Sequence, residues 1–276
     1  MADAATPAEL WRSARTRDPS RPFVTAYDDS GGRVELSYAT VDNWVAKTAN
    51  MLLDGLDAAP GERVALALPV HWQSIVWYLA CWHTGLVAVP TDTHELPEAD
   101  IVVTGPQQLT QALDSPAREI VATSLHPMGA PLPDCPPPAV DYATEVRSFG
   151  DQFTRPAGGT ATGPALDWGG EHTTASGLVA LGQERAQRWG LTPQDRVAII
   201  TSQYQSQYQS QYQSPTAPGT GIAWLLAAVT SASALVLVSD SNPGGLFGRL
   251  DMEHVTAFVD ATPGQSVAVS DVRALT

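Results

Sequence analysis

The chain has 276 residues, 43% of them hydrophobic, so it can bury a substantial core in one large or two medium α/β units. Its formal net charge of −14 at pH 7 opposes binding to phosphate backbones and anionic headgroups, which excludes nucleic acid as the expected partner. The two cysteines are too few for a disulfide framework or a cysteine-based zinc site. With no long apolar run, the sequence predicts a cytoplasmic protein without a membrane anchor.

The amino-terminal region predicts a helix, a hairpin and a second helix. Residues 7–17 are expected to be helical, and residues 22–27 and 33–36 to form short strands around a Gly-containing turn. Residues 38–53 carry apolar side chains at helical spacing, and Gly55 is placed to end that helix.

A βαβ unit follows, because a buried strand, an apolar helix and a second buried strand succeed one another. The expected elements are a strand at 63–68, a helix at 73–84, strands at 86–89, 101–103 and 120–122, and a helix at 107–113. The Pro-rich residues 127–138 prevent regular structure and are the expected linker.

The second half repeats this scheme. Residues 46–68 and 181–200 both run from an amphipathic helix through a Pro-containing turn into Arg-Val-Ala and a buried strand. A helix at 222–230 and a strand at 234–238 complete the second copy. The interpretation is two related α/β subdomains, 1–139 and 140–276, each a mainly parallel sheet flanked by helices; chance similarity of two βαβ units is the alternative.

A low-complexity insertion, residues 202–214, interrupts the second copy, and Gln-Tyr-Gln-Ser occurs in it three times in succession. Such polar tracts bury little apolar surface, so a solvated loop without chemistry is favoured over a tyrosine-rich binding loop. The exact repetition also leaves open a slipped or engineered sequence.

Several phrases within residues 5–125 resemble the amino-terminal part of AMP-dependent synthetases and ligases, the acyl-adenylate-forming superfamily. They are Pro22-Phe23-Val24, Leu36-Ser37-Tyr38, Pro60-Gly61-Glu62-Arg63-Val64-Ala65-Leu66, and Ala80-Cys81-Trp82-His83-Thr84-Gly85 before Val87-Ala88-Val89-Pro90. The length and pattern are most similar to a small actinobacterial group of AMP-binding-like proteins. The resemblance implies the two-subdomain large domain of those enzymes without their carboxy-terminal domain.

The same resemblance implies a phosphate loop of Ser, Thr and Gly that ends in Pro-Lys-Gly. The nearest stretch here provides Gly158, Gly159, Thr160, Thr162 and Gly163, whose backbone amides could cradle an anion. Ala165 stands where the lysine is expected. Since fourteen of the fifteen basic residues are Arg and only Lys47 is Lys, no segment supplies the loop lysine or the family's catalytic lysine.

Other candidate sites are weaker. Gly219, Thr220 and Gly221 enter an apolar helix and could receive an anion, although a helix-start turn explains them equally well. No pair of the six histidines has metal-ligand spacing, and no metal is expected. The pairs His94-Glu95 and Glu171-His172 are expected to be solvated loop residues rather than an acid/base pair. Trp72, Trp77 and Trp82 do not share one helical face, so some are expected to be buried; ordinary core packing is favoured over an exposed tryptophan, which would mark a partner interface.

The sequence thus predicts a non-catalytic relative of adenylating enzymes that acts as a binding or assembly module. The alternative is a ligand-binding or partner-completed enzyme that keeps an acyl or adenine-nucleotide pocket between the subdomains; if active, it would be an AMP-forming acyl ligase. No cofactor is expected, with ATP or AMP as the alternative. A protein partner is the interaction left open, and the sequence does not indicate the oligomeric state.

Overall fold

The computed structural model describes residues 5–27, 32–91, 95–154, 159–201, 220–239, 243–260 and 272–275. The predicted low-complexity insertion and the residues Gly158, Gly219 and His94 lie outside this part of the chain. The helices are α1 (Pro7–Arg17), α2 (Tyr38–Asn50) with a π-helical turn at Met51–Gly55, α3 (Trp72–Thr84), α4 (Leu109–Leu113), α5 (Tyr142–Glu145), α6 (Ala175–Arg188), α8 (Thr220–Ser231) and α9 (Pro243–Met252). Short 3-10 turns occupy Pro106–Gln108 and Val146–Ser148.

Two mostly parallel sheets form the framework. The seven-stranded sheet has the order β7 (Val140–Asp141), β6 (Glu119–Ala122), β5 (Ile101–Thr104), β3 (Arg63–Ala67), β4 (Val87–Pro90), β8 (Pro164–Trp168) and β9 (Glu171–Thr174). The six-stranded sheet has the order β13 (Arg273–Ala274), β12 (Ala257–Asp260), β10 (Arg196–Thr201), β11 (Ala234–Ser239), β1 (Pro22–Tyr27) and β2 (Arg33–Ser37). Only β2 and β9 run antiparallel to their neighbours. The expected α/β class with two mainly parallel sheets is therefore confirmed.

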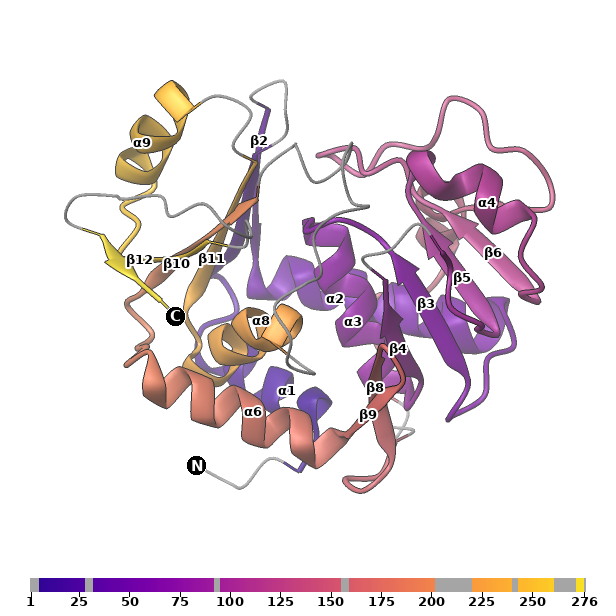
Figure 1. Cartoon of the computed structure of the whole chain (residues 1–276), viewed down its shortest axis with the longest axis horizontal. Helices are drawn as coiled ribbons and strands as arrows, with labels where there is room; N and C mark the ends of the chain where they lie inside the picture. Colours follow the sequence, from indigo (N-terminus) through magenta and orange to yellow (C-terminus); the bar gives the residue numbers. More distant parts are fainter. Residues whose placement is uncertain are drawn as a thin grey trace.

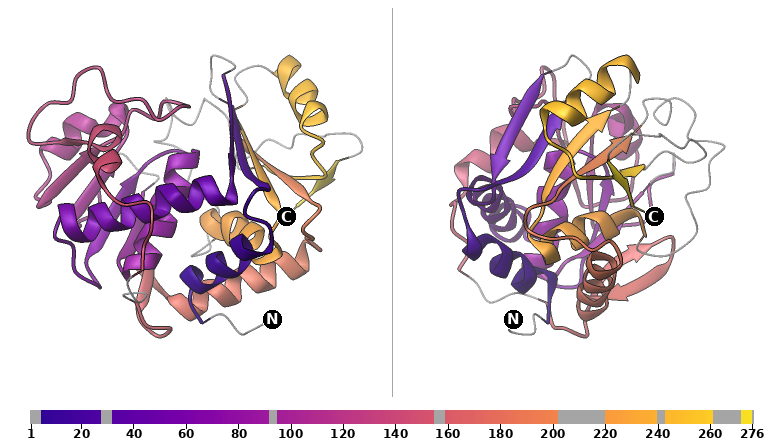
Figure 2. Two further views of the ribbon diagram at one scale, coloured as in Figure 1. Left: turned by 180° about the vertical axis from the view of Figure 1, so that it is seen from behind. Right: turned by 90° about the vertical axis from the view of Figure 1, so that its left-hand side faces the viewer.

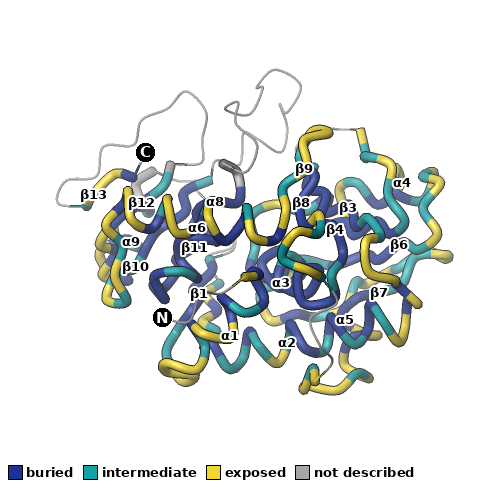
Figure 3. The backbone as a smooth tube through the Cα atoms, turned by 90° about the horizontal axis from the view of Figure 1, so that it is seen from below, coloured by how far each residue is buried: buried dark blue, intermediate teal, exposed yellow. Residues whose placement is uncertain are grey.

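The elements form five layers, with α1, α2, α3, α6 and α8 between the two sheets (Figure 1). The central core joins alternate residues of both sheets, such as Val197 and Leu66. The outer face of the six-stranded sheet packs on α9, and that of the seven-stranded sheet packs on α4. Because both faces are covered, strands such as β10 are continuous apolar runs. Figure 3 shows the buried backbone concentrated in this middle layer.

The predicted duplication is confirmed in topology. A hairpin, a helix, a strand, a helix and a strand succeed one another as β1–β2–α2–β3–α3–β4 and again as β8–β9–α6–β10–α8–β11. Local details repeat as well: each hairpin has a register shift just after its first proline, Pro22 or Pro164. In each copy the last strand residue, Ser37 or Thr174, accepts a hydrogen bond from the first turn of the following helix.

The two copies exchange their hairpins. The β1–β2 hairpin of the first copy pairs with β11 of the second, with Val24 opposite Leu235. The β8–β9 hairpin of the second copy pairs with β4 of the first, with Ala88 opposite Leu166. Figure 2 shows the indigo amino-terminal hairpin beside the orange and yellow strands of the other copy. The predicted boundary at 139/140 is therefore a division of the sequence, and each sheet takes strands from both sides of it.

Most predicted elements lie within two residues of their observed bounds, and residues 123–139, which include the expected Pro-rich linker, contain no helix or strand. The favoured interpretation, core packing of the tryptophans of α3, fits the structure, because Trp72, Trp77 and Trp82 are all at most 4% exposed, and the alternative of a surface tryptophan is wrong. The physical reason is that α3 is enclosed by α1, α2 and the seven-stranded sheet, and a helix buried all round has no outward face. Among the described helices, none is both long enough and apolar enough to cross a membrane.

Candidate functional site

The predicted phosphate loop lies directly before β8, at the amino edge of the seven-stranded sheet. Gly159 packs against the residue that ends α3, since a Cβ on Gly159 would lie 3.2 Å from the Cα atom of Gly85. Ala165, at the position expected for lysine, is buried in β8, and its carbonyl oxygen accepts a 3.1 Å hydrogen bond from Nε1 of Trp82. The close packing explains a glycine at 159 without reference to a ligand.

Backbone amides around this loop are used within the protein. The amide of Gly163 donates to the carbonyl oxygen of Thr160 at 3.0 Å. At the start of α6, Ala175 donates to the carbonyl oxygen of Gly163 at 3.0 Å and Ser176 to that of Ala161 at 2.8 Å. The turn therefore satisfies the first amides of α6, which have no partner within the helix. Anion binding by residues 159–163 stays a prediction, and it would compete with these bonds.

The second candidate loop is separate from the first. Thr220 and Gly221 begin α8, which follows β10 and therefore starts from the carboxyl edge of the six-stranded sheet. The 159–163 turn lies at the amino edge of the other sheet. The two segments therefore lie at different sheets, one at an amino edge and the other at a carboxyl edge. They share no sheet edge at which they could form one phosphate site.

The only lysine has a structural partner. Nζ of Lys47, on α2, donates a 2.6 Å hydrogen bond to the carbonyl oxygen of Phe149. Phe149 begins residues 149–154, which we call the strap because they run across α2. Nδ2 of Asn50 holds the same segment by donating to the carbonyl oxygens of Gly150 and Gln152 at 2.9 and 3.0 Å. Gly55 leaves space for the strap, since a Cβ there would lie 2.6 Å from Cζ of Phe149.

Nearly all described arginines also have protein partners. Carboxylate partners bind Arg15, Arg33, Arg63, Arg118, Arg185, Arg188, Arg196 and Arg273, main-chain carbonyl oxygens bind Arg21 and Arg147, and the Tyr27 ring binds Arg249. Arg17 is also engaged. Arg12 is the exception in the described chain, because its guanidinium makes no ion pair or hydrogen bond there. Little positive charge is therefore left to neutralise a triphosphate.

Glu171 and His172 are predicted to be solvated loop residues, but the structure places them in a strand. Glu171 and His172 are both exposed, as expected, but they are successive residues of the edge strand β9 and point to opposite faces of the sheet. Nδ1 of His172 instead lies 3.6 Å from Oδ2 of Asp167, a buried carboxylate that also binds Arg63. Sequence reasoning missed Asp167, because an aspartate in a short strand gives no signal of burial. In the described residues no cluster of His, Cys, Asp and Glu is arranged to hold a metal ion.

A second buried carboxylate was also missed. Glu253 follows α9 with a side chain that is 4% exposed, and its oxygens accept 2.7 Å hydrogen bonds from Arg33 and Arg196 and one of 2.6 Å from the Tyr27 hydroxyl. Thr25 lies in the same cluster, because Arg196 also reaches its hydroxyl at 3.4 Å. All partners come from other elements, so Glu253 ties α9 to the hairpin β1–β2 and to β10.

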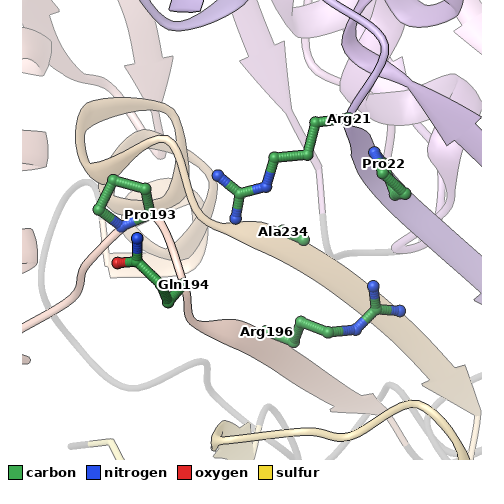
Figure 4. Close-up of a pocket in the computed structure, with 6 residues that line it drawn as sticks. All are labelled: Arg21, Pro22, Pro193, Gln194, Arg196 and Ala234. Carbon is green, nitrogen blue, oxygen red and sulfur yellow. The ribbon is translucent and has the colours of Figure 1, made fainter. Parts of the chain in front are cut away.

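A cavity of about 450 Å³ lies at the amino edge of the six-stranded sheet, lined by Arg21, Pro22, Pro193, Gln194, Arg196 and Ala234 (Figure 4). The guanidinium of Arg21 points toward Gln194 and donates to the carbonyl oxygen of Ala232 at 3.0 Å, whereas that of Arg196 turns away along β11 toward Glu253. Ligands of open α/β sheets bind beyond the carboxyl ends of strands. This cavity is at the opposite edge, and its cations are already bound.

Known proteins with the same fold were found by comparison. The family model described as AMP-binding enzyme matches residues 10–104. In solved structures, the chain aligns with an anthranilate CoA ligase in complex with anthranoyl-AMP at a TM-score of 0.70 and 13% identity, over 92% of this chain and 49% of that one. It aligns with a fatty acyl-adenylate ligase from L. pneumophila at a TM-score of 0.64 and 14% identity, over 94% of this chain and 44% of that one. The fold is that of acyl-adenylate-forming enzymes, and the chain spans about half the length of these structures.

Sequence comparison identifies a more specific family. A TIGR03089 family protein of Mycobacterium tuberculosis is 34% identical over 245 residues, which cover 87% of this chain and 91% of that protein. The chain belongs to the TIGR03089 family. A shorter match, 38% identical over 93 residues, joins 33% of this chain to 14% of novobiocin biosynthesis protein H from Streptomyces niveus.

Proposed function

We propose that this chain is a non-catalytic member of the acyl-adenylate-forming superfamily and acts as a binding or assembly module. The observation that carries the proposal is the bond between Nζ of Lys47 and the carbonyl oxygen of Phe149, because it uses the only ammonium side chain in the sequence. Adenylation builds up negative charge at the α-phosphate and on pyrophosphate, which positioned cations must stabilise. In the described part of the chain, nearly all lysine and arginine side chains already have partners within the protein.

Other properties support a module of the cytoplasm. Cys81 is buried and Cys135 is partly buried, and both are free thiols. Unpaired cysteines fit the reducing compartment expected from the sequence. The two sheets enclose one large apolar core, so the scaffold is complete enough to hold surface residues in place for binding without catalysis.

The test is exchange of labelled pyrophosphate into ATP by the purified chain, with magnesium and a panel of aliphatic, aromatic and amino carboxylic acids. No exchange above the protein-free background is expected. A full-length fatty acyl-adenylate ligase assayed with its own substrate is the positive control for the reagents. Exchange that depends on both the chain and one of the acids would overturn the proposal.

The alternative function is a ligand-binding protein or an enzyme completed by a separate chain. It is favoured by the retention of both sheets, which align with ligase structures over more than nine-tenths of this chain. Calorimetric titration with ATP, AMP and an acyl-CoA discriminates between the two functions. Saturable binding of any of the three at about 1 mM or below supports the alternative, and absence of heat at that concentration removes it.

A further inference from the structure

A second cavity, of about 420 Å³, opens among α1, α2, the carboxyl end of α3 and the strap. Arg12 and Arg15 line it from α1, Asp42 and Asn43 from α2, His83 from α3 and Asp151 from the strap. None of these residues belongs to the loops that sequence analysis selected. Its volume is within the range of small-molecule sites.

The walls of this cavity are held in place by hydrogen bonds and an ion pair. Asp42 receives a 2.8 Å hydrogen bond from Nε1 of the buried Trp11 on one oxygen and a 2.6 Å ion pair from Arg15 on the other. The strap is held on α2 by Lys47 and Asn50. Cations and acceptors that are already held in place lose less freedom when they bind a ligand.

His83 supplies a buried acceptor. It is 8% exposed, and burial lowers the pKa of its ring, so the imidazole is neutral at pH 7. Nδ1 lies 2.7 Å from the carbonyl oxygen of Leu79 and must carry the ring hydrogen, because a carbonyl oxygen cannot donate. Nε2 therefore presents a lone pair, and the hydrogen bond that His83 makes within the described chain uses Nδ1. An acceptor on a cavity wall fits a ligand that donates a hydrogen bond.

The charges on the walls are arranged in two groups. Arg12 and Arg15 are three residues apart, so they lie on one face of α1. Both, together with Asp42, are close enough to His83 to act on its ring electrostatically, and Asp42 neutralises Arg15. Arg12 makes no ion pair, and neither does Asp151 on the strap, in the part of the chain that the structure describes. The cavity thus has one uncommitted cation, Arg12, beside the Arg15–Asp42 pair, and uncommitted acceptors at His83 and Asp151.

We propose that this cavity is a binding site for a small hydroxylated organic anion. The carboxylate or phosphate group of the ligand binds Arg12, beside the Arg15–Asp42 ion pair, and its hydroxyl groups donate to Nε2 of His83 and to the carboxylate of Asp151. This site does not depend on whether the chain catalyses adenylation, because its residues lie outside the predicted phosphate loops.

The experiment is calorimetric titration of the full chain with matched probes. Malate and succinate differ by one hydroxyl group, and glycerol 3-phosphate and inorganic phosphate differ by the hydroxylated carbon chain. The indole N–H resonance of Trp11 gives a second readout, because this group hydrogen-bonds Asp42 in the cavity wall. The variants are Arg12→Gln, His83→Asn, whose amide retains the donor to Leu79, and Arg188→Gln on the exposed face of α6 as a charge-matched control.

At least one hydroxylated probe is expected to bind with a dissociation constant of about 1 mM or lower and to shift the Trp11 resonance. Arg12→Gln is expected to weaken binding about 10-fold, and His83→Asn to remove the preference over the matched probe without a hydroxyl group. Comparison of the affinities for malate and glycerol 3-phosphate decides whether the site prefers a carboxylate or a phosphate. The proposal fails if no probe binds at about 10 mM, if Arg188→Gln has the same effect as Arg12→Gln, or if binding leaves Trp11 unshifted.

Discussion

Nε of Arg33, on β2, donates a 2.7 Å hydrogen bond to Oε1 of Glu253, which lies 220 residues further along the chain. The bond joins the amino-terminal hairpin to the carboxyl end of α9, and Arg196 of β10 binds the other carboxylate oxygen at 2.7 Å. One buried carboxylate therefore connects both copies of the repeat.

Replacement of this carboxylate should destabilise the fold. Glu253→Gln leaves Arg33 and Arg196 without their shared anion, and we expect a loss of about 2 kcal/mol in the free energy of unfolding. The loss stays below that of a fully enclosed pair because the two arginine side chains are 40% and 23% exposed. Urea denaturation measures it. Glu35→Gln, which removes a more exposed partner of Arg33, is the control and should cost less than about 1 kcal/mol.

The same carboxylate should make stability depend on pH. Burial alone would raise the pKa of Glu253, but hydrogen bonds from Arg33 and Tyr27 and the charges of Arg33 and Arg196 outweigh it, so the pKa lies below its ordinary value. The unfolded chain then binds the proton more readily than the folded chain. The contribution of Glu253 is complete above the unfolded pKa of about 4.3 and is lost as the pH falls through the folded value.

Urea midpoints of the wild type and Glu253→Gln, compared from about pH 7 down to about pH 3, test this dependence. The difference between the two proteins should be constant near neutrality and shrink below about pH 4.3. Asp195, whose pKa is also lowered, titrates in both proteins and cancels in the comparison. A difference that stays constant down to the lowest pH would contradict the assignment.

Packing of α6 on α8 depends on Gly182. A Cβ at this position would lie 2.9 Å from the carbonyl oxygen of Leu226 and 2.8 Å from Oγ1 of Thr230. Gly182→Ala should therefore separate the two helices and cost about 1 to 3 kcal/mol, despite the better helix propensity of alanine. Gly248→Ala is the matched control on α9, where no atom lies within 4 Å of the added Cβ, and it should stabilise the protein by up to about 1 kcal/mol. Thermal melting of both variants checks the pair.

Lys47 should stabilise the strap, residues 149–154, on α2. Lys47→Met removes the donor to the carbonyl oxygen of Phe149, and we expect it to lower the free energy of unfolding by about 1 to 2 kcal/mol and to increase proteolysis in residues 149–154. Lys47→Arg keeps a cationic donor and should restore part of the protection. Equal proteolysis of the wild type and Lys47→Met would show that the lysine does not hold the strap.

Local patterns in the sequence were sufficient for the helices and strands but not for their long-range pairing. Apolar spacing and a terminal glycine predict α3 almost to its ends, because Gly85 takes the left-handed conformation that closes the helix. The repeat between 46–68 and 181–200 predicts that two similar units exist. Nothing local indicates that Val24 pairs with Leu235, since any exposed strand edge satisfies the same alternation pattern.

The sequence likewise predicts which residue types are present at the candidate site but not which partners they bind. The absence of a second lysine is a property of composition, so the sequence alone predicts that the candidate loops contain no lysine. The partners of those that remain depend on tertiary structure: Arg63 binds Asp167 across β4, and Lys47 binds a main-chain oxygen more than a hundred residues away. The cavity around His83 was missed because its walls come from four separate segments.

The exchanged hairpins set an order of events during synthesis on the ribosome. The β1–β2 hairpin emerges well before its neighbour β11, because α2 to β10 lie between them in the sequence. Until then the apolar edge of β1 has no native strand beside it, and such distant pairings form slowly. Docking of the amino-terminal hairpin onto β11 is therefore expected to be a late step in the folding of this chain.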